Sequence, residues 1–202
     1  MVEKSLWTRQ VERDPNHSHW YVQRFKDMAA KGADLHGEAR MIDAVLPRSG
    51  RVLDAGCGPG RLGGELARRG HTTVGVDVDP VLIEAARAEF PECTWILQDL
   101  AELDLPAAGV TEAFDVAVAA GNVMAFLAPS TRRTVLTNLA GVLAEQGRLV
   151  IGFGAGRGYA VEEFLDDARS AGLAESVRLG TWDLRPWTPE AGFLVAILER
   201  SA

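Results

Sequence analysis

The stretch RVLDAGCGPGRLGG, residues Arg51–Gly64, decides the fold of this chain. It begins with a short apolar run typical of a buried strand and continues with glycines at alternate positions, Gly56, Gly58 and Gly60. Glycine has no Cβ, so the main chain at such a turn lies very close to a ligand. A helix is predicted from Arg61 onward, and its first N–H groups point into the same space. The pattern indicates a nucleotide site formed by a strand, a glycine turn and a helix.

Strands and helices alternate along most of the chain. Runs of β-branched and apolar residues predict strands, and amphipathic stripes between them predict helices. Such alternation favours an open, mostly parallel sheet with helices on both faces. Besides the opening stretch, the predicted strands are Thr72–Asp77, Cys93–Leu97, Phe114–Ala120, Arg148–Phe153, Ala174–Leu179 and Phe193–Glu199, and the predicted helices are His19–Ala30, Asp34–Leu46, Val81–Glu89, Ser130–Leu143 and Tyr159–Ser170.

The C-terminal part of the chain has a different pattern. Between the last two predicted strands, residues 180–192 contain two prolines and no helical stripe. Strands without a crossover helix between them should pair antiparallel. The predicted fold is therefore an α/β three-layer sandwich whose mostly parallel sheet has an antiparallel C-terminal strand. We expect one domain over residues 1–202, with an N-terminal helical cap at 1–34 and the core at 35–199.

Composition limits the partners of the chain. It has 202 residues and a net charge of −7, from 21 basic and 28 acidic residues, without a basic run. Nucleic acids and anionic membranes both require a basic surface, so neither is expected as a partner. The N-terminus is too polar for a signal peptide, and no apolar run approaches ~18 residues. A cytoplasmic protein, monomeric or homodimeric, is expected. No spacing of His, Cys, Asp or Glu predicts a metal site.

The glycine turn alone leaves the ligand open. Dinucleotide dehydrogenases use a similar turn with an acidic residue about 20 positions later, and Asp77 stands at that distance from Gly56. Asp54, inside the strand before the turn, would repel a pyrophosphate and attract an ammonium or sulfonium, a difference of several kcal/mol at ~4 Å. Asp99 follows the third strand and suits an exocyclic amino group such as that of adenine. These carboxylates predict a pocket for an adenosine with a cationic tail.

On these residues the chain resembles the class I S-adenosylmethionine-dependent methyltransferases, which have a Rossmann-like fold. The resemblance covers roughly residues 35–199, and its motifs follow one another in the order typical of that family. The glycine block and the acidic end of the second strand are specific together and only suggestive apart. The matching stretches are VLDAGCGPGRLG (Val52–Gly63), VGVDVDP (Val74–Pro80), QDL (Gln98–Leu100), FDVAVAAGNVMAFL (Phe114–Leu127) and GRLVIGF (Gly147–Phe153).

The resemblance implies S-adenosylmethionine as cofactor and assigns a role to each site residue. The glycine turn would pack against the methionine part of the cofactor. Asp77 would bind both ribose hydroxyls, while Val78 packs on the adenine. The adenine amino group would meet Asp99, and a ring nitrogen would meet the Leu100 amide. The methionyl end would be lined by Asp54, Gly56, Cys57 and Gly58, and the space beneath the sulfonium by Ala119, Gly121 and Asn122.

Several of these residues have an alternative structural role. Asp54 could bond loop amides and hold the turn, and Asp99 could cap whatever follows it. Asn122 is either a contact or a turn residue. Asp79, next to Pro80, is expected to cap the helix that follows rather than to bind a ligand.

The N-terminal aromatic residues also leave two interpretations open. Trp20, Tyr21 and Arg24 could form a lid in which Tyr21 and Arg24 contact the cofactor, with the planar guanidinium pairing its carboxylate. They could equally form one side of a surface helix. Trp182 and Trp187, in the prolyl loop, are expected to pack against the sheet.

The function predicted from the sequence is methyl transfer from S-adenosylmethionine to a small-molecule acceptor by in-line displacement. The main task of the protein in such a reaction is alignment and desolvation. The sequence shows no convincing general base, so no catalytic residue is predicted. Two alternatives remain: a cofactor-binding or interaction protein with a methyltransferase-like fold and no catalysis, and an NAD-dependent oxidoreductase.

Overall fold

The computed structural model describes residues 2–201; residues 1 and 202 of the predicted domain lie outside the described range. Seven strands form one sheet in the order β3-β2-β1-β4-β5-β7-β6. Every pairing from β3 to β5 is parallel, and β7 pairs antiparallel with both β5 and β6. The strands are β1 (Arg51–Ala55), β2 (Thr72–Asp77), β3 (Thr94–Leu97), β4 (Phe114–Ala119), β5 (Leu143–Gly154), β6 (Leu173–Leu179) and β7 (Phe193–Arg200). The predicted fold class is confirmed, including the antiparallel pairing of the last two strands.

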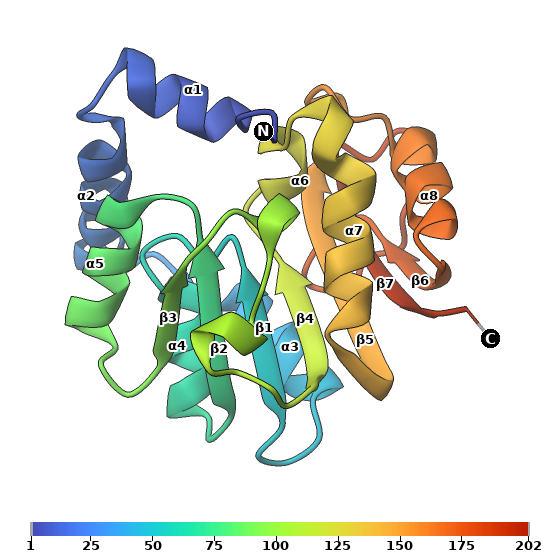
Figure 1. Cartoon of the computed structure of the whole chain (residues 1–202), viewed down its shortest axis with the longest axis horizontal. Helices are drawn as coiled ribbons and strands as arrows, with labels where there is room; N and C mark the ends of the chain where they lie inside the picture. The colour runs from blue at the N-terminus through green and yellow to red at the C-terminus, as the bar shows by residue number, and fades with distance from the viewer. Residues whose placement is uncertain (1, 202) are drawn as a thin grey trace.

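Helices cover the sheet and its upper edge (Figure 1). The α-helices are α1 (Leu6–Arg13), α2 (His17–Ala30), α3 (Gly37–Val45), α4 (Arg61–Arg68), α5 (Pro80–Glu89), α6 (Val123–Phe126), α7 (Arg132–Gly141) and α8 (Val161–Ser170). Three short 3-10 helices are η1 (Leu100–Glu102), η2 (Pro106–Ala108) and η3 (Pro129–Thr131). None of the helices in residues 2–201 is long and apolar enough to cross a membrane.

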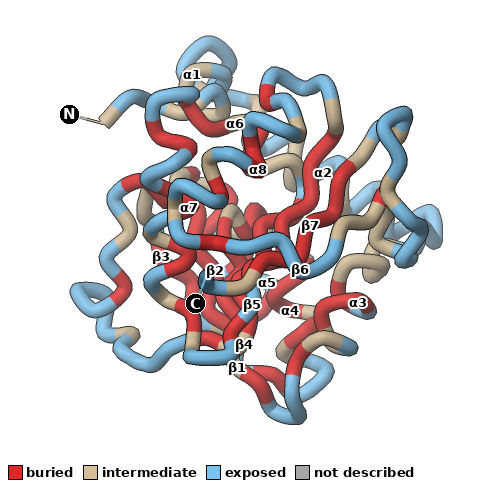
Figure 2. The backbone as a smooth tube through the Cα atoms, turned by 90° about the vertical axis from the view of Figure 1, so that its right-hand side faces the viewer, coloured by how far each residue is buried: buried red, intermediate tan, exposed pale blue. Residues whose placement is uncertain are grey.

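The core lies on both faces of the sheet because successive strand residues point to opposite sides. In β1, Leu53 belongs to the apolar cluster beneath α7 and α8, whereas Val52 belongs to the cluster beneath α3 and α4. Both side chains are fully buried. Continuous rather than alternating apolar sequence is what a parallel strand covered on both faces requires. Figure 2 shows this burial concentrated in the central strands and the exposed residues in the outer helices and loops.

Three helices begin later than predicted. The predicted helix Asp34–Leu46 begins at Gly37 because the Asp34 carboxylate bonds the His36 amide and the Arg40 guanidinium outside the helix. The residues before α7 form η3 at Pro129 instead, and α8 begins two residues after Tyr159. Strand β5 is longer than predicted, running from Leu143 to Gly154.

Two helices, α1 and α6, were not predicted from the sequence. Helix α1 (LWTRQVER) is only eight residues long and buries no residue fully, and its three apolar residues, Leu6, Trp7 and Val11, are a short signal for a sequence-based prediction. Its start is marked by Ser5, whose hydroxyl accepts a hydrogen bond from the Thr8 amide at 3.0 Å. Helix α6 has only four residues. Figure 1 shows α1 above the carboxyl ends of the central strands, where these two helices frame the candidate site.

The prolyl loop before β7 packs on the sheet through its tryptophans. The Trp182 ring lies over the bare backbone of Gly152 in β5, where a Cβ would come within 2.3 Å of it. Trp187 packs against the cluster beneath α7 and α8, and the Arg178 guanidinium lies 4.8 Å from the centre of its ring. Both observations agree with the predicted packing role.

Candidate cofactor site

The glycine turn connects β1 to α4 with a backbone that other residues would not adopt. Gly56, Gly58 and Gly60 have φ values of 75°, 55° and 82°, in the left-handed region that glycine enters without a steric penalty. A Cβ at Gly56 would lie 2.5 Å from a methyl carbon of Val123. The turn is joined to β2 by hydrogen bonds from the Gly56 and Cys57 amides to the Val76 carbonyl, at 2.8 and 3.0 Å. The spacing of the glycines is therefore required by the turn itself.

Asp77, the last residue of β2, binds this turn through its side chain. One carboxylate oxygen accepts a hydrogen bond from the Gly58 amide at 2.8 Å, and the other accepts one from the Asp79 amide at 2.9 Å. The residue is buried, and burial raises the pKa of its carboxyl to about 6. The carboxylate of Asp77 thus lies at the end of β2, where two backbone amides orient it.

Asp54 supports the helix that follows the turn. Its carboxylate accepts a hydrogen bond from the Gly63 amide at 3.0 Å, and the residue is 2 % exposed. Burial raises the pKa of the Asp54 carboxyl to about 7, against the opposing effects of the Gly63 hydrogen bond and the Arg61 charge. The supporting role considered from the sequence is therefore present, and a contact with the cofactor stays a prediction.

Asp99 and Asn122 also have local structural bonds. The Asp99 carboxylate accepts a hydrogen bond from the Ala101 amide at 2.9 Å and caps η1. Asn122 has a left-handed backbone with φ 69°, and its side-chain oxygen accepts a hydrogen bond from the Gly154 amide at 2.7 Å. Asn122 is thus a turn residue that ties β4 to β5, while Asp99 both caps a helix and faces a cavity.

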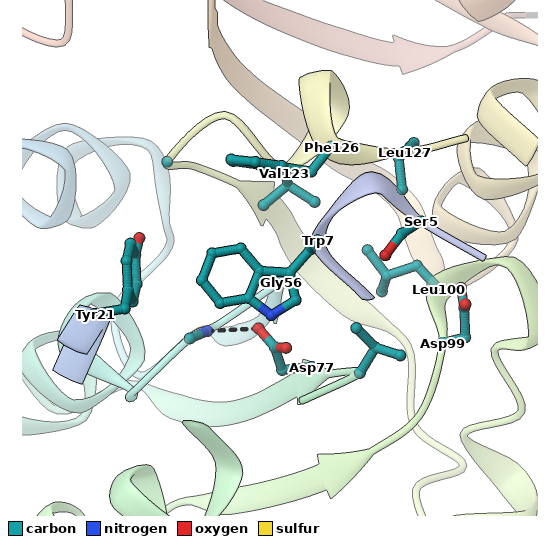
Figure 3. A pocket seen from close by; sticks show the side chains of 13 residues that line it. Ser5, Trp7, Tyr21, Gly56, Asp77, Asp99, Leu100, Val123, Phe126 and Leu127 are labelled. Carbon is teal, nitrogen blue, oxygen red and sulfur yellow. Dashed lines mark hydrogen bonds between the residues drawn. The ribbon is translucent and has the colours of Figure 1, made fainter. Parts of the chain in front are cut away.

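Two adjoining cavities open at the carboxyl ends of the strands, and Figure 3 shows the first of them. We call the first, of about 630 Å³, the strand-end cavity, and the second, of about 400 Å³, the glycine-turn cavity. The strand-end cavity is lined by Ser5, Trp7, Tyr21, Gly56, Gly58, Asp77, Val78, Asp99, Leu100, Gly121, Val123, Phe126 and Leu127. The glycine-turn cavity is lined by Tyr21, Phe25, Asp54, Gly56, Cys57, Gly58, Pro59, Arg61, Leu62, Ala120 and Gly121.

The structure brings ten of the thirteen predicted cofactor residues to these cavities and leaves three outside. Ala119 is fully buried within β4, and the Asn122 side chain is bonded to β5. Arg24 is exposed on α2, where its guanidinium lies 5.7 Å from the centre of the Trp20 ring. Its neighbour Tyr21 turns inward and lines both cavities, so α2 presents one predicted contact to the site and the other to solvent.

The residues that cover the strand-end cavity were not predicted from the sequence. Trp7 comes from α1, and Val123 and Phe126 come from α6 (Figure 3). In the glycine-turn cavity, Arg61 was also not predicted; it is paired with Glu38 of α3 through hydrogen bonds of 2.8 and 3.0 Å. Phe126 lies in Phe114–Leu127, one of the stretches that resemble the methyltransferase family, so this resemblance could have identified it as a site residue. No residue near Trp7 in the sequence indicates that Trp7 reaches the strand ends.

The strand-end cavity suits the adenosine part of S-adenosylmethionine in its charge. The bare backbone at Gly56 and Gly58 leaves room that a Cβ would fill. No Lys or Arg of residues 2–201 lines the strand-end cavity, and two carboxylates do, which suits hydroxyl and amino donors and disfavours a phosphate. Residues 2–201 contain no group of three or more His, Cys, Asp and Glu side chains placed to hold a metal ion.

Comparison with known proteins identifies the class. Residues 52–147 match a family described as "Methyltransferase domain". An uncharacterized methyltransferase of Mycobacterium tuberculosis is 32 % identical over 158 residues, which cover 77 % of this chain and 67 % of that protein. The crystal structure of a TehB-like SAM-dependent methyltransferase from Corynebacterium glutamicum is 45 % identical, with a TM-score of 0.88, and covers 93 % of this chain and 100 % of that one.

A more distant structure shares the fold. The magnesium protoporphyrin IX methyltransferase of Synechocystis, solved with bound SAM, has a TM-score of 0.61 at 21 % identity and covers 95 % of this chain and 84 % of that one. The fold and the site thus define a Rossmann-like, S-adenosylmethionine-binding enzyme. The chain belongs to the class I S-adenosylmethionine-dependent methyltransferases, and S-adenosylmethionine is its cofactor.

Proposed function

We propose that this methyltransferase transfers its methyl group to a small, uncharged acceptor that enters beneath α1, α2 and α6. The observation that supports this proposal is the wall of the strand-end cavity. Apart from Asp77 and Asp99, its lining contains no side chain that is charged at neutral pH. With Asp77 and Asp99 occupied by the cofactor, a charged acceptor would lose its hydration there without gaining an opposite charge, which is unfavourable.

The two strand-end carboxylates belong to the cofactor in this proposal. Asp77 would accept hydrogen bonds from the ribose hydroxyls, with Val78 against the adenine. Asp99 would accept one from the adenine amino group, and the Leu100 amide would donate to a ring nitrogen. The glycine-turn cavity, with Asp54, Cys57 and Gly121 among its lining residues, would take the methionyl end. Ala119 and Asn122 would support this site from outside the cavities.

Helices α1, α2 and α6, which we call the cover, would align the acceptor and exclude water. S-adenosylmethionine supplies a methyl carbon already activated by its sulfonium, so the protein acts mainly by positioning and desolvation. Tyr21, Trp7 and Phe126 surround the entrance with aromatic surface. Burial raises the pKa of the Tyr21 phenol, which therefore stays neutral at physiological pH. The cover thus adds no charge to the site.

The chain is also proposed to act as one domain, with residues 1–34 as an N-terminal helical cap and 35–199 as the core. A cytoplasmic location, and a monomeric or homodimeric state without nucleic-acid or membrane partners, belong to the same proposal. The Synechocystis protein is named for a small-molecule acceptor, magnesium protoporphyrin IX, which is consistent with a small-molecule acceptor here. The oxidoreductase alternative receives no support from the comparisons.

Calorimetric titration with S-adenosylhomocysteine tests the cofactor site. Wild type should bind it and should not bind NAD. Asp77→Ala should weaken binding by roughly a hundredfold, because it removes a charged acceptor and releases the Gly58 amide that shapes the turn. The matched control is Asp166→Ala, whose carboxylate on α8 is 68 % exposed. Unchanged binding in Asp77→Ala would contradict the assignment of the ribose site.

A screen with labelled S-adenosylmethionine tests the acceptor. Pairs of compounds that share a nucleophile and differ in a carboxylate or ammonium group should be methylated only in the uncharged form. Preference for the charged member would contradict the proposal. Binding of the cofactor without turnover of any compound would favour the non-catalytic alternative.

A further inference from the structure

Asp79 lies between β2 and α5 and uses each of its two carboxylate oxygens for a different purpose. The first, Oδ1, accepts hydrogen bonds from the Val81 and Leu82 amides at 2.9 and 3.3 Å. This is the helix cap predicted from the sequence. The residue is 3 % exposed, so its second oxygen also requires a partner.

The second oxygen of Asp79 is shared by the two N-terminal helices. The Trp7 indole of α1 donates to Oδ2 at 2.8 Å. The Ser18 hydroxyl of α2, a fully buried residue, donates to the same atom. Oδ2 of Asp79 therefore joins α1 and α2 through Trp7 and Ser18, which lie 72 and 61 positions away in the sequence. Hydrogen bonds to an ionised acceptor are roughly twice as strong as neutral ones.

The indole held in this way lies over the cofactor site. Its ring centre is 5.1 Å from that of Tyr21 and 5.6 Å from that of Phe126, both in edge contacts. Figure 3 shows the Trp7 ring between Asp77 on one side and Val123 and Phe126 on the other. The Asp79 amide, in turn, donates to the Asp77 carboxylate at 2.9 Å. The anchor of the cover and the proposed ribose ligand are thus directly bonded.

We infer that Asp79 is a positioning residue: its second carboxylate oxygen fixes α1 and α2 so that Trp7 covers the strand-end cavity. The residue acts through Trp7 and Ser18 and does not itself contact the cofactor. This inference rests on the proposed function, in which the cofactor lies against Asp77. We call the hydrogen bonds from Trp7 and Ser18 to this oxygen the clamp. Its loss should uncover the cavity and weaken cofactor binding, while the strand ends and the glycine turn stay as they are.

Three variants separate the clamp from the cap. Trp7→Phe keeps an aromatic ring and removes the indole donor, and Ser18→Ala removes the hydroxyl; both leave Asp79 and its cap intact. In Asp79→Asn one oxygen becomes an amide nitrogen, which cannot accept a hydrogen bond. The matched control is Trp20→Phe, because Trp20 is 54 % exposed on the same cover.

The readouts are the dissociation constant for S-adenosylhomocysteine and the NMR signals of the indole N–H groups. The Trp7 signal is identified by its loss in Trp7→Phe. We expect Asp79→Asn to shift that signal and to weaken binding roughly tenfold. Trp7→Phe with Ser18→Ala should weaken binding similarly, and adding Asp79→Asn to that pair should change little more, since the three side chains form one unit. Trp20→Phe should bind as wild type does.

Each other outcome has a definite meaning. Wild-type affinity in Asp79→Asn, or in Trp7→Phe with Ser18→Ala, would overturn the clamp and leave the proposed function standing. Fully additive effects of the three changes would also overturn it, because Asp79 would then act through α5 or Asp77. If wild type itself binds no S-adenosylhomocysteine, the proposed function fails and the clamp fails with it.

Discussion

The floor and the cover of the site are built in different ways. The floor consists of the glycine turn and the carboxylates at the ends of β1, β2 and β3; the cover consists of α1, α2 and α6. In the floor, Asp54, Asp77 and Asp99 each accept a backbone amide hydrogen bond. In the cover, Trp7 and Ser18 are held by side-chain bonds to Asp79.

This difference separates what the fold dictates from what individual side chains add. Backbone amides at the end of a strand or the start of a helix are in place whenever the sheet forms, so the floor is preorganised by the fold. The cover depends on a few long side chains that meet only in the folded chain. Changes in the floor should therefore affect stability and binding together, whereas changes in the cover should affect binding with little loss of stability.

The largest effect is expected from Gly56→Ala in the floor. A left-handed backbone costs a residue other than glycine about 1–2 kcal/mol, and crowding against Val123 adds about 1–3 kcal/mol. Urea unfolding should show both losses, and S-adenosylhomocysteine binding should be lost as well. Gly32→Ala is the control, with φ 73° and no atom within 4 Å of the added Cβ. Equal stability losses at the two glycines would show that Val123 gives way, and Val123→Ala should remove only the additional loss at Gly56.

The second effect is a pH dependence of stability that comes from the floor. Burial raises the pKa of Asp54 to about 7 in the folded chain, against about 3.9 when unfolded. Between these values the folded state binds the extra proton, so stability falls as the pH rises from about 4 to 7. Asp54→Asn should lack this fall.

Between pH 5 and pH 8, we expect the free energy of unfolding of Asp54→Asn to rise by a few kcal/mol relative to that of wild type, as measured by urea unfolding at both pH values. A smaller dependence of the same sign should persist, because burial also raises the pKa of Asp77, to about 6. The stability of the control Asp166→Asn, exposed on α8, should change with pH as that of wild type does. If Asp54→Asn and wild type differ in their free energy of unfolding by the same amount at both pH values, Asp54 is ionised without penalty and the description of the floor is wrong.

The smallest effect is expected from Arg24→Ala on the outer side of the cover. Its guanidinium lies on the Trp20 ring and outside both cavities, so S-adenosylhomocysteine should bind within about twofold of wild type. Arg61→Ala, the comparison, removes a residue that lines the glycine-turn cavity and leaves Glu38 without its partner; it should weaken binding more. A tenfold loss in Arg24→Ala would mean that α2 turns when the cofactor binds.

The floor could be predicted from the sequence because its signals are local. The bounds of β2, Thr72–Asp77, agree with the prediction, and Asp79 caps α5 as its position before Pro80 indicates. The antiparallel end of the sheet followed from the missing crossover helix before Phe193. In each of these cases the residues that decide the structure are neighbours in the chain.

The cover could not be predicted because its bonds join distant residues. Nothing in the sequence around Trp7 indicates that its indole reaches Asp79, and α1 is only eight residues long, too short to give a clear helical pattern. The sequence left open whether Tyr21 and Arg24 form a lid or one side of a surface helix; the structure places Tyr21 at both cavities and leaves Arg24 exposed outside them. Asn122 was left open between contact and turn, and only the structure shows its bond to β5.

The most direct test of the central claim, that the strand-end carboxylates hold the cofactor, is a crystal structure of the chain with S-adenosylhomocysteine. We expect the ribose hydroxyls within hydrogen-bond distance of Asp77, about 2.5–3.0 Å, the adenine amino group at Asp99, and the Trp7 indole still bonded to Asp79 over the cavity. A ligand bound elsewhere, or one whose ribose makes no contact with Asp77, would contradict the account.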